Sequence, residues 1–248
     1  MLIYRSFMKI RNRVFVKDKL EEGVQLKLDQ KVAHYLFHVL RCKNGEYISL
    51  FNESSEWLSS IDKLSSKEAI ISITENIKIA EKKREITLYF SPIKKSQTEL
   101  VIQKCTEIGV TNFQPILMER TNFSSFNIDR LNLIAIEAIE QSEQMKIPKI
   151  YEPIKFDKLL SQDQKNKITL VCSVEEKNNS IRNIIKDNNA NSYALFIGPE
   201  GDFSESEMNS IKEKENYLTV SLGDTVLKSE TASITAAAIL KDCLLNDY

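Results

Sequence analysis

The sequence predicts an α/β protein of two domains, a small β-rich barrel followed by a larger domain built on a mainly parallel sheet. Three observations support this fold class. Residues 1–75 alternate short apolar runs with polar turns, which is typical of β-strands. From Ile86 onward, strand-like and helix-like segments alternate, as they do in parallel-sheet domains. The 248 residues, 42% hydrophobic and 28% charged, suit two modest cores.

The first domain, residues 1–75, is expected to contain five strands and one helix. Apolar runs between polar turns predict the strands at residues 13–16, 24–28, 46–51, 56–62 and 69–77. A helix is expected within residues 29–45, because apolar residues at helical spacing precede a turn at Asn44-Gly45. The charged segment 76–85 lacks large apolar residues after Ile79, which predicts a linker.

The second domain, residues 86–248, is expected to alternate strands with helices. The apolar runs predict strands at residues 86–91, 112–118, 168–173, 193–198 and 217–222. Helices are expected at residues 98–108, 128–143, 180–186, 205–214 and 231–245. In a parallel sheet of this kind, the carboxyl ends of the strands meet at one edge.

Two consecutive strand-end loops hold three of the six glycines. The stretch "IGPEGDFSESE" contains a turn at Gly198–Asp202, and Ser204 with Glu207 forms a capping box that starts a helix. The stretch "LGDTVLKSETA" follows the next strand and also leads into a helix. Either loop could be a plain tight turn, but loops at adjacent strand ends can line one pocket. We therefore expect a binding site there.

The ligand of this site is expected to lack phosphates. Neither the Walker pattern nor the Rossmann glycine pattern occurs, which disfavours nucleoside triphosphates and dinucleotides. Both loops carry acids rather than a cluster of cations: Glu200, Asp202, Asp224 and Glu230. Backbone and acids suit an uncharged purine or a sulfonium cation, so an adenosyl cofactor is the natural candidate.

The N-terminal segment is rich in cations. Six Lys or Arg residues and one acid lie within the first nineteen residues, with aromatic residues interleaved. This pattern can bind a phosphate backbone and offer stacking surfaces to RNA bases. It can equally form a solvated edge strand that its cations protect from aggregation. Both interpretations stay open from these residues alone.

Metal, membrane and secretion signals are not evident. His34 and His38 lie four residues apart on the predicted helix without further ligands, which favours surface packing or RNA contact over a metal site. The four cysteines form no C-x-x-C pair and are expected to be reduced. No apolar run suits a membrane helix, and cations interrupt the N-terminal apolar residues. A cytoplasmic protein is expected.

Ordered motifs along nearly the whole chain carry a family resemblance. "FIGPEGDFSESE" and "LGDTVLKSETASITA" resemble the I-G-P-E-G-G-[FL]-S-x-x-E and L-G-x-R-[IV]-L-R-x-E-T-A motifs of the ribosomal RNA uridine-N3 methyltransferases of the RsmE type. Upstream, "HYLFHVLRCKNGEYISLF", "SPIKKSQTELVIQKCTEIGV" and "EQSEQMKIP" are similar to further motifs of that family, in the same order.

The resemblance implies an N-terminal PUA-like barrel that binds RNA and a SPOUT domain with a C-terminal trefoil knot. It implies S-adenosylmethionine as cofactor, a homodimer through the knotted domain, and small-subunit (16S) ribosomal RNA or the assembled 30S subunit as partner. The implied cofactor contacts are Gly198, Pro199, Glu200, Gly201, Leu222, Gly223, Val226, Leu227 and Thr231. The catalytic candidates are Glu200, Glu230 and Lys228. The RNA-binding candidates are Arg5, Arg11, Arg13, His34, His38, Arg41 and Lys94.

This sequence departs from the family pattern at four positions. Asp202 stands for the second glycine of the G-G pair, and Gln144, Thr225 and Lys228 stand for arginines. The planar guanidinium that grips phosphate or carboxylate is lost at the last three positions. Two alternatives to the uridine-N3 enzyme therefore stay open: a SPOUT-fold RNA-binding protein without activity, and a methyltransferase with another RNA acceptor such as a ribose 2′-hydroxyl.

Overall fold

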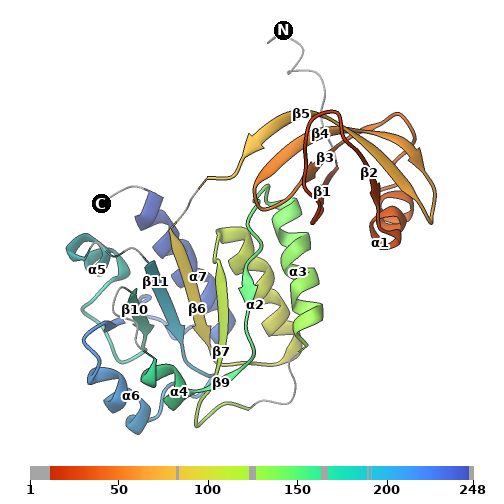
Figure 1. Ribbon diagram of the computed structural model, residues 1–248. Coiled ribbons are helices and arrows are strands. Elements are labelled where there is room, and N and C mark those ends of the chain that lie inside the picture. The colour runs from red at the N-terminus through yellow and green to blue at the C-terminus, as the bar shows by residue number, and fades with distance from the viewer. Residues whose placement is uncertain are drawn as a thin grey trace. The chain divides into compact units, whose positions relative to one another are not determined.

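The chain folds into two compact units in the computed structural model, which describes residues 12–81, 84–122, 127–162, 167–188, 190 and 192–245 (Figure 1). The first unit comprises Met1–Lys82 together with Ile139–Lys146, and the second comprises Lys83–Ala138 and Ile147–Tyr248. The chain passes from the first unit to the second between Lys82 and Lys83, and Ile139–Lys146 returns to the first unit.

The first unit contains a five-stranded sheet. Its strands are β1 (Arg13–Phe15), β2 (Gln25–Leu28), β3 (Tyr47–Phe51), β4 (Ser55–Leu64) and β5 (Ala69–Ile79). The spatial order is β1-β3-β4-β5-β2; β1 runs parallel to β3 and the other neighbours are antiparallel. All five lie where the apolar runs predict strands. Because β5 extends to Ile79 and the next strand begins at Glu85, the predicted linker is shorter than ten residues.

The helix of the first unit changes register along its length. It begins as α1 (Gln30–His34), where the Asp29 side chain accepts a hydrogen bond from the Val32 amide at 2.9 Å, and continues as the π-helix η2 (Tyr35–Val39). The Leu40 amide donates to the Tyr35 carbonyl five residues back at 3.0 Å, which gives the wider turn. Helical spacing predicts a helix here but not this change of register.

A buried ion pair anchors β1 within the first unit. The Arg13 guanidinium lies 3.5 Å from the centre of the Phe51 ring and donates to both Glu56 carboxylate oxygens at 2.9 and 3.1 Å. Its remaining Nη1 donates to the Ile139 carbonyl at 2.8 Å. The Ser49 hydroxyl also donates to Glu56. These contacts join β1, β3 and β4 to the returning segment Ile139–Lys146.

The second unit is built on a seven-stranded sheet of its described residues. The strands are β6 (Glu85–Phe90), β7 (Asn112–Leu117), β8 (Lys149–Ile150), β9 (Ile154–Lys155), β10 (Lys167–Cys172), β11 (Ser192–Ile197) and β12 (Tyr217–Val220). The order is β12-β10-β11-β6-β7-β8, with β9 also paired to β7, and every pairing is parallel. The predicted parallel α/β architecture is confirmed.

Helices cover both faces of this sheet. They are α2 (Lys95–Ile108), α3 (Ile128–Gln141), α4 (Phe156–Ser161), α5 (Ile181–Asp187), α6 (Glu205–Lys212) and α7 (Ser229–Leu245). Adjacent residues of β6 belong to two different cores: Leu88 to a core with residues of α2, α3, α5 and α7, and Tyr89 to a core with residues of α4 and α6. Because both faces of the sheet are buried, its strands consist of continuous apolar runs in the sequence.

None of the helices in the described residues is both long and apolar enough to cross a membrane. The four cysteines are free thiols, and burial raises the pKa of Cys105 and of Cys172 to about 12. They therefore behave as small hydrophobic residues.

Candidate functional site

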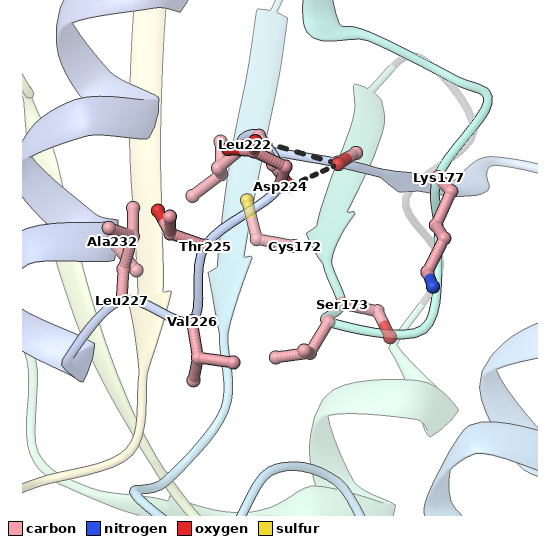
Figure 2. A pocket seen from close by; sticks show the side chains of 12 residues that line it. Cys172, Ser173, Lys177, Leu222, Asp224, Thr225, Val226, Leu227 and Ala232 are labelled. Atoms are coloured by element: carbon pink, nitrogen blue, oxygen red, sulfur yellow. Dashed lines mark hydrogen bonds between the residues drawn. The ribbon is translucent and has the colours of Figure 1, made fainter.

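A cavity of about 590 Å³ opens at the carboxyl ends of β10 and β12 (Figure 2). Residues at the end of β10 and after it form one wall, residues after β12 form a second wall, and α7 contributes one residue. The lining consists of Cys172, Ser173, Val174, Lys177, Ser221, Leu222, Gly223, Asp224, Thr225, Val226, Leu227 and Ala232. Strand ends in an open parallel sheet are where such folds bind ligands.

The wall after β12 contains a glycine turn. Gly223 has a φ of +132°, a conformation that residues with side chains rarely adopt. The Ser221 hydroxyl holds this turn, since it accepts from the Gly223 amide at 3.2 Å and donates to the Gly223 carbonyl at 3.1 Å. A Cβ added at Gly223 would meet no atom within 4 Å. The glycine is therefore required by the backbone conformation, not by a neighbouring side chain.

The loop after β11 packs closely against neighbouring side chains at its two glycines. A Cβ at Gly198 would lie 3.1 Å from the Phe203 ring, and a Cβ at Gly201 would lie 3.3 Å from the Arg120 side chain. Asp202 has a φ of +58°. Aspartate tolerates this left-handed conformation, and its carboxylate accepts a hydrogen bond from the Phe203 amide at 2.8 Å. The turn thus keeps its shape although Asp202 replaces a glycine of the family pattern.

Two charged side chains hold the loop after β11 against the loop after β7. Arg120 donates to the Gly201 carbonyl at 2.5 Å, and its Nη1 lies 3.4 Å from the Phe203 carbonyl oxygen. The buried Glu207 carboxylate accepts from the Glu119 amide at 2.8 Å and from the Ser204 amide at 2.9 Å. Glu207 thus completes the predicted capping box and joins the two loops as well.

The predicted cofactor residues divide into two groups. Leu222, Gly223, Val226 and Leu227 line the cavity. The cavity lining does not include Gly198, Pro199, Glu200, Gly201 and Thr231. The loop after β11 is nevertheless joined to the start of α7, because the Ser229 hydroxyl donates to the Gly198 carbonyl at 3.2 Å.

Sequence reasoning missed the wall after β10 and the Arg120 contact. Cys172, Ser173, Val174 and Lys177 belong to a stretch without glycine or any recognised motif, so only their position after an apolar strand could have indicated them. Arg120 contacts the loop after β11 from 81 residues away, a separation that no local pattern reveals.

The catalytic candidates lie in or beside the two loops. Glu200 and Lys228 are exposed, and Glu230 is half-buried in the first turn of α7, where a negative charge also offsets the helix dipole. Their catalytic roles stay predictions.

The RNA-binding candidates have different environments. The Arg13 side chain is 10% exposed and its guanidinium is occupied by Glu56 and the Ile139 carbonyl, so we assign it a structural role in place of its predicted RNA contact. Arg5 and Arg11 lie outside the described residues. Arg41 and Lys94 are exposed.

The exposed histidines form an aromatic surface on η2 and the end of α1. His34 and His38 have ring centres 4.4 Å apart, and the Phe37 ring meets His38 edge-on at 4.9 Å. Phe37 is 42% exposed. Surfaces of this kind can stack on unpaired RNA bases.

The cavity fits the expected adenosyl cofactor in size and chemistry. Ligand pockets typically measure about 300–1,000 Å³, which includes this one. Its charged lining is one cation, Lys177, and one anion, Asp224; hydroxyl, apolar and backbone groups make up the rest. This balance suits a zwitterionic sulfonium ligand better than a polyphosphate. The described residues contain no group of three or more His, Cys, Asp or Glu that could hold a metal ion.

Comparisons with known proteins place this site in context. A family model described as an RNA methyltransferase domain matches residues 80–241, and one described as an RNA methyltransferase PUA domain matches residues 28–74. The ribosomal RNA small subunit methyltransferase E of Rickettsia conorii is 32% identical over 230 residues, which cover 92% of this chain and 93% of that protein.

Two solved structures share the fold. A putative methyltransferase from Legionella pneumophila, in complex with the bound cofactor SAM, has a TM-score of 0.82 and 26% identity, with 93% of this chain and 96% of that chain covered. A ribosomal RNA small subunit methyltransferase E from Neisseria gonorrhoeae, bound to S-adenosyl methionine, has a TM-score of 0.85 and 24% identity, with 93% and 97% covered.

Proposed function

Because the chain belongs to the ribosomal RNA small subunit methyltransferase E family, we propose that it transfers a methyl group from S-adenosylmethionine to N3 of a uridine in 16S ribosomal RNA. One observation carries the cofactor assignment: the cavity at the ends of β10 and β12 is walled by the family's L-G-x-x-[IV]-L loop. The SAM-bound Legionella protein, 26% identical to this chain, supports the same cofactor.

The pocket residues bind and orient the cofactor. S-adenosylmethionine supplies a methyl group activated by its sulfonium. The backbone around Gly223 offers donors and acceptors to the adenosyl part, and Leu222 and Leu227 exclude water from it. Lys177 and Asp224 match the opposite charges of the methionyl end. Alignment of donor and acceptor then contributes much of the acceleration.

The acceptor side requires loss of a proton from the uracil imide. Glu200 and Glu230 are the proposed proton acceptors, and Lys228 is the proposed stabiliser of the oxyanion that develops on the base. All three lie in or beside the two loops. Glu200 is exposed, so an RNA substrate can reach it without displacing packed side chains.

The first unit is the proposed RNA-binding module. Its exposed His34, His38 and Arg41 offer stacking and charge, and Phe37 extends the aromatic surface. Arg5 and Arg11 in the first unit and Lys94 in the second are further proposed contacts to phosphate. The substrate is small-subunit rRNA, either free or within the assembled 30S subunit.

A homodimer and a trefoil knot complete the proposal. Val226 is 78% exposed and Val174 is 51% exposed, although both line the cavity. Exposed apolar side chains around a pocket suit burial by a ligand or by a second copy of the chain. We propose that a second copy packs here and that the segment from β11 to α7 threads a knot around the cofactor.

Label transfer tests the activity. Purified protein incubated with methyl-labelled S-adenosylmethionine is expected to label small-subunit rRNA or 30S subunits and not large-subunit rRNA. Protein that binds this RNA but transfers no label would favour the non-catalytic alternative, which the loss of arginines at Gln144, Thr225 and Lys228 motivates.

Restoring one arginine is expected to improve transfer. Thr225 is exposed at the cavity, where the family motif has arginine. Thr225→Arg should raise kcat/KM on rRNA by roughly tenfold, because one charge-assisted hydrogen bond contributes about 1.5 kcal/mol. Thr225→Met is the matched control, since it adds length without charge. Equal kcat/KM for the arginine, methionine and wild-type proteins would refute a substrate contact at this position.

A further inference from the structure

A single carboxylate organises the loop between β10 and α5. One oxygen of Glu176 accepts hydrogen bonds from three successive backbone amides, those of Lys177, Asn178 and Asn179, at 3.0, 2.8 and 3.2 Å. Its other oxygen accepts from the Thr219 hydroxyl at 2.9 Å. The backbone amide of Asn178 is the largest cause, and the Thr219 hydroxyl the next, of a lowered pKa of Glu176.

The two residues of this contact adjoin the two walls of the cavity. Glu176 lies between Val174 and Lys177, which line the wall after β10. Thr219 lies on β12, two residues before Ser221, where the opposite wall begins. Backbone bonds reinforce the junction, because the Ser221 amide donates to the Asn179 carbonyl at 2.8 Å and the Ser173 amide donates to the Val220 carbonyl at 3.2 Å.

Hydrogen bonds, rather than apolar packing, hold the shape of this loop. Val174, Glu175, Lys177, Asn178 and Asn179 are all exposed, so apolar packing contributes little there. The segment after Ser173 carries no glycine or proline that would fix a turn. Among these bonds, those of Glu176 are the side-chain bonds that join the Lys177 backbone to Thr219 on β12.

We propose that Glu176 is a positioning residue of the cofactor pocket: it fixes the loop after β10 against β12 and so sets the distance between the two walls. This inference rests on the proposed function, since it assigns the cavity to S-adenosylmethionine. Glu176 itself does not line the cavity and acts through Val174 and Lys177. Its removal widens the pocket without changing a group that contacts RNA.

The test measures S-adenosylmethionine affinity and methyl transfer in the full-length protein. Glu176→Ala removes all four hydrogen bonds and is expected to raise the Kd and KM for S-adenosylmethionine about tenfold or more, with kcat changed less than about twofold. Glu176→Gln keeps an acceptor oxygen for the backbone amides, so it should recover most of the affinity. Thr219→Val removes only the bond to β12 and should raise Kd by about threefold.

Glu175→Gln is the matched control, because this neighbouring carboxylate is exposed and does not line the cavity. The affinity of Glu175→Gln for S-adenosylmethionine should equal that of the wild type. Circular dichroism melting of each variant separates a local effect from unfolding. If Glu176→Ala unfolds, the Kd of Thr219→Val for S-adenosylmethionine tests the positioning role instead. Wild-type protein that does not bind S-adenosylmethionine would overturn the proposed function. Wild-type binding with unchanged Kd in folded Glu176→Ala or in Thr219→Val would overturn the positioning role alone.

Discussion

Replacing Gly223 by valine is expected to lower the affinity for S-adenosylmethionine by about a hundredfold or more. The φ of +132° at Gly223 disfavours any side chain, and a β-branched one most strongly. Backbone strain of about 1–3 kcal/mol must be relieved by moving the turn, and each 1.4 kcal/mol corresponds to about tenfold in affinity. The valine side chain would also occupy space at the cavity, which Gly223 lines.

Titration calorimetry of the wild-type and mutant proteins measures this loss. Gly45→Val is the control, because Gly45 has a similarly positive φ of +82° but lies in a turn of the first unit. It should reduce the stability of that unit and leave the affinity for S-adenosylmethionine unchanged. Unchanged binding in Gly223→Val would remove this loop from the cofactor site.

Truncation of Glu56 is expected to destabilise the first unit by about 3–5 kcal/mol, the range measured when one partner of a buried ion pair is removed. Glu56 is 8% exposed and its carboxylate receives both Arg13 donors and the Ser49 hydroxyl. In Glu56→Ala, the Arg13 guanidinium stays against the Phe51 ring without its counter-charge. A marginally stable domain of this size would lose much of its free energy of unfolding.

Urea denaturation followed by the fluorescence of Trp57, which lies on β4 in the first unit, reports this change. Arg182→Ala is the control, because Arg182 pairs with Asp242 on the surface, where the two side chains are 63% and 45% exposed. Exposed ion pairs contribute little to the free energy of unfolding, so the urea midpoint of Arg182→Ala should stay close to that of the wild type. An equally small shift for Glu56→Ala would contradict the structural role assigned to Arg13.

The main elements could be predicted because their signals are local. Five apolar runs in each predicted domain correspond to strands. Both buried parallel strands and short antiparallel strands appear in the sequence as apolar runs between polar segments. Ser204 and Glu207 form the predicted capping box, because this motif depends on residues three apart. The two-residue strands β8 and β9 and the six-residue α4 are too short to show a period.

Features that depend on distant contacts could not be predicted. Arg13 looks like part of a basic RNA-binding segment until its partner Glu56, 43 residues away, is known. From the sequence, Asp202 is only a departure from the glycine motif of the family. In the structure, its own carboxylate supports the left-handed turn. The wall after β10 carries no motif, and its shape depends on the contact between Glu176 and Thr219, 43 residues apart.

Nucleoside mass spectrometry after the labelling reaction distinguishes methylation of uridine N3 in small-subunit rRNA from methylation of another atom of the RNA. Small-subunit rRNA lacking the modification is incubated with the protein and S-adenosylmethionine, digested to nucleosides, and compared with N3-methyluridine and 2′-O-methyluridine standards. The expected product is N3-methyluridine, and it should be absent with Gly223→Val; sequencing of larger fragments from a parallel partial digest should place it at a single position. Methylation at a ribose 2′-hydroxyl, or none in free rRNA and 30S subunits alike, would contradict methylation of uridine N3.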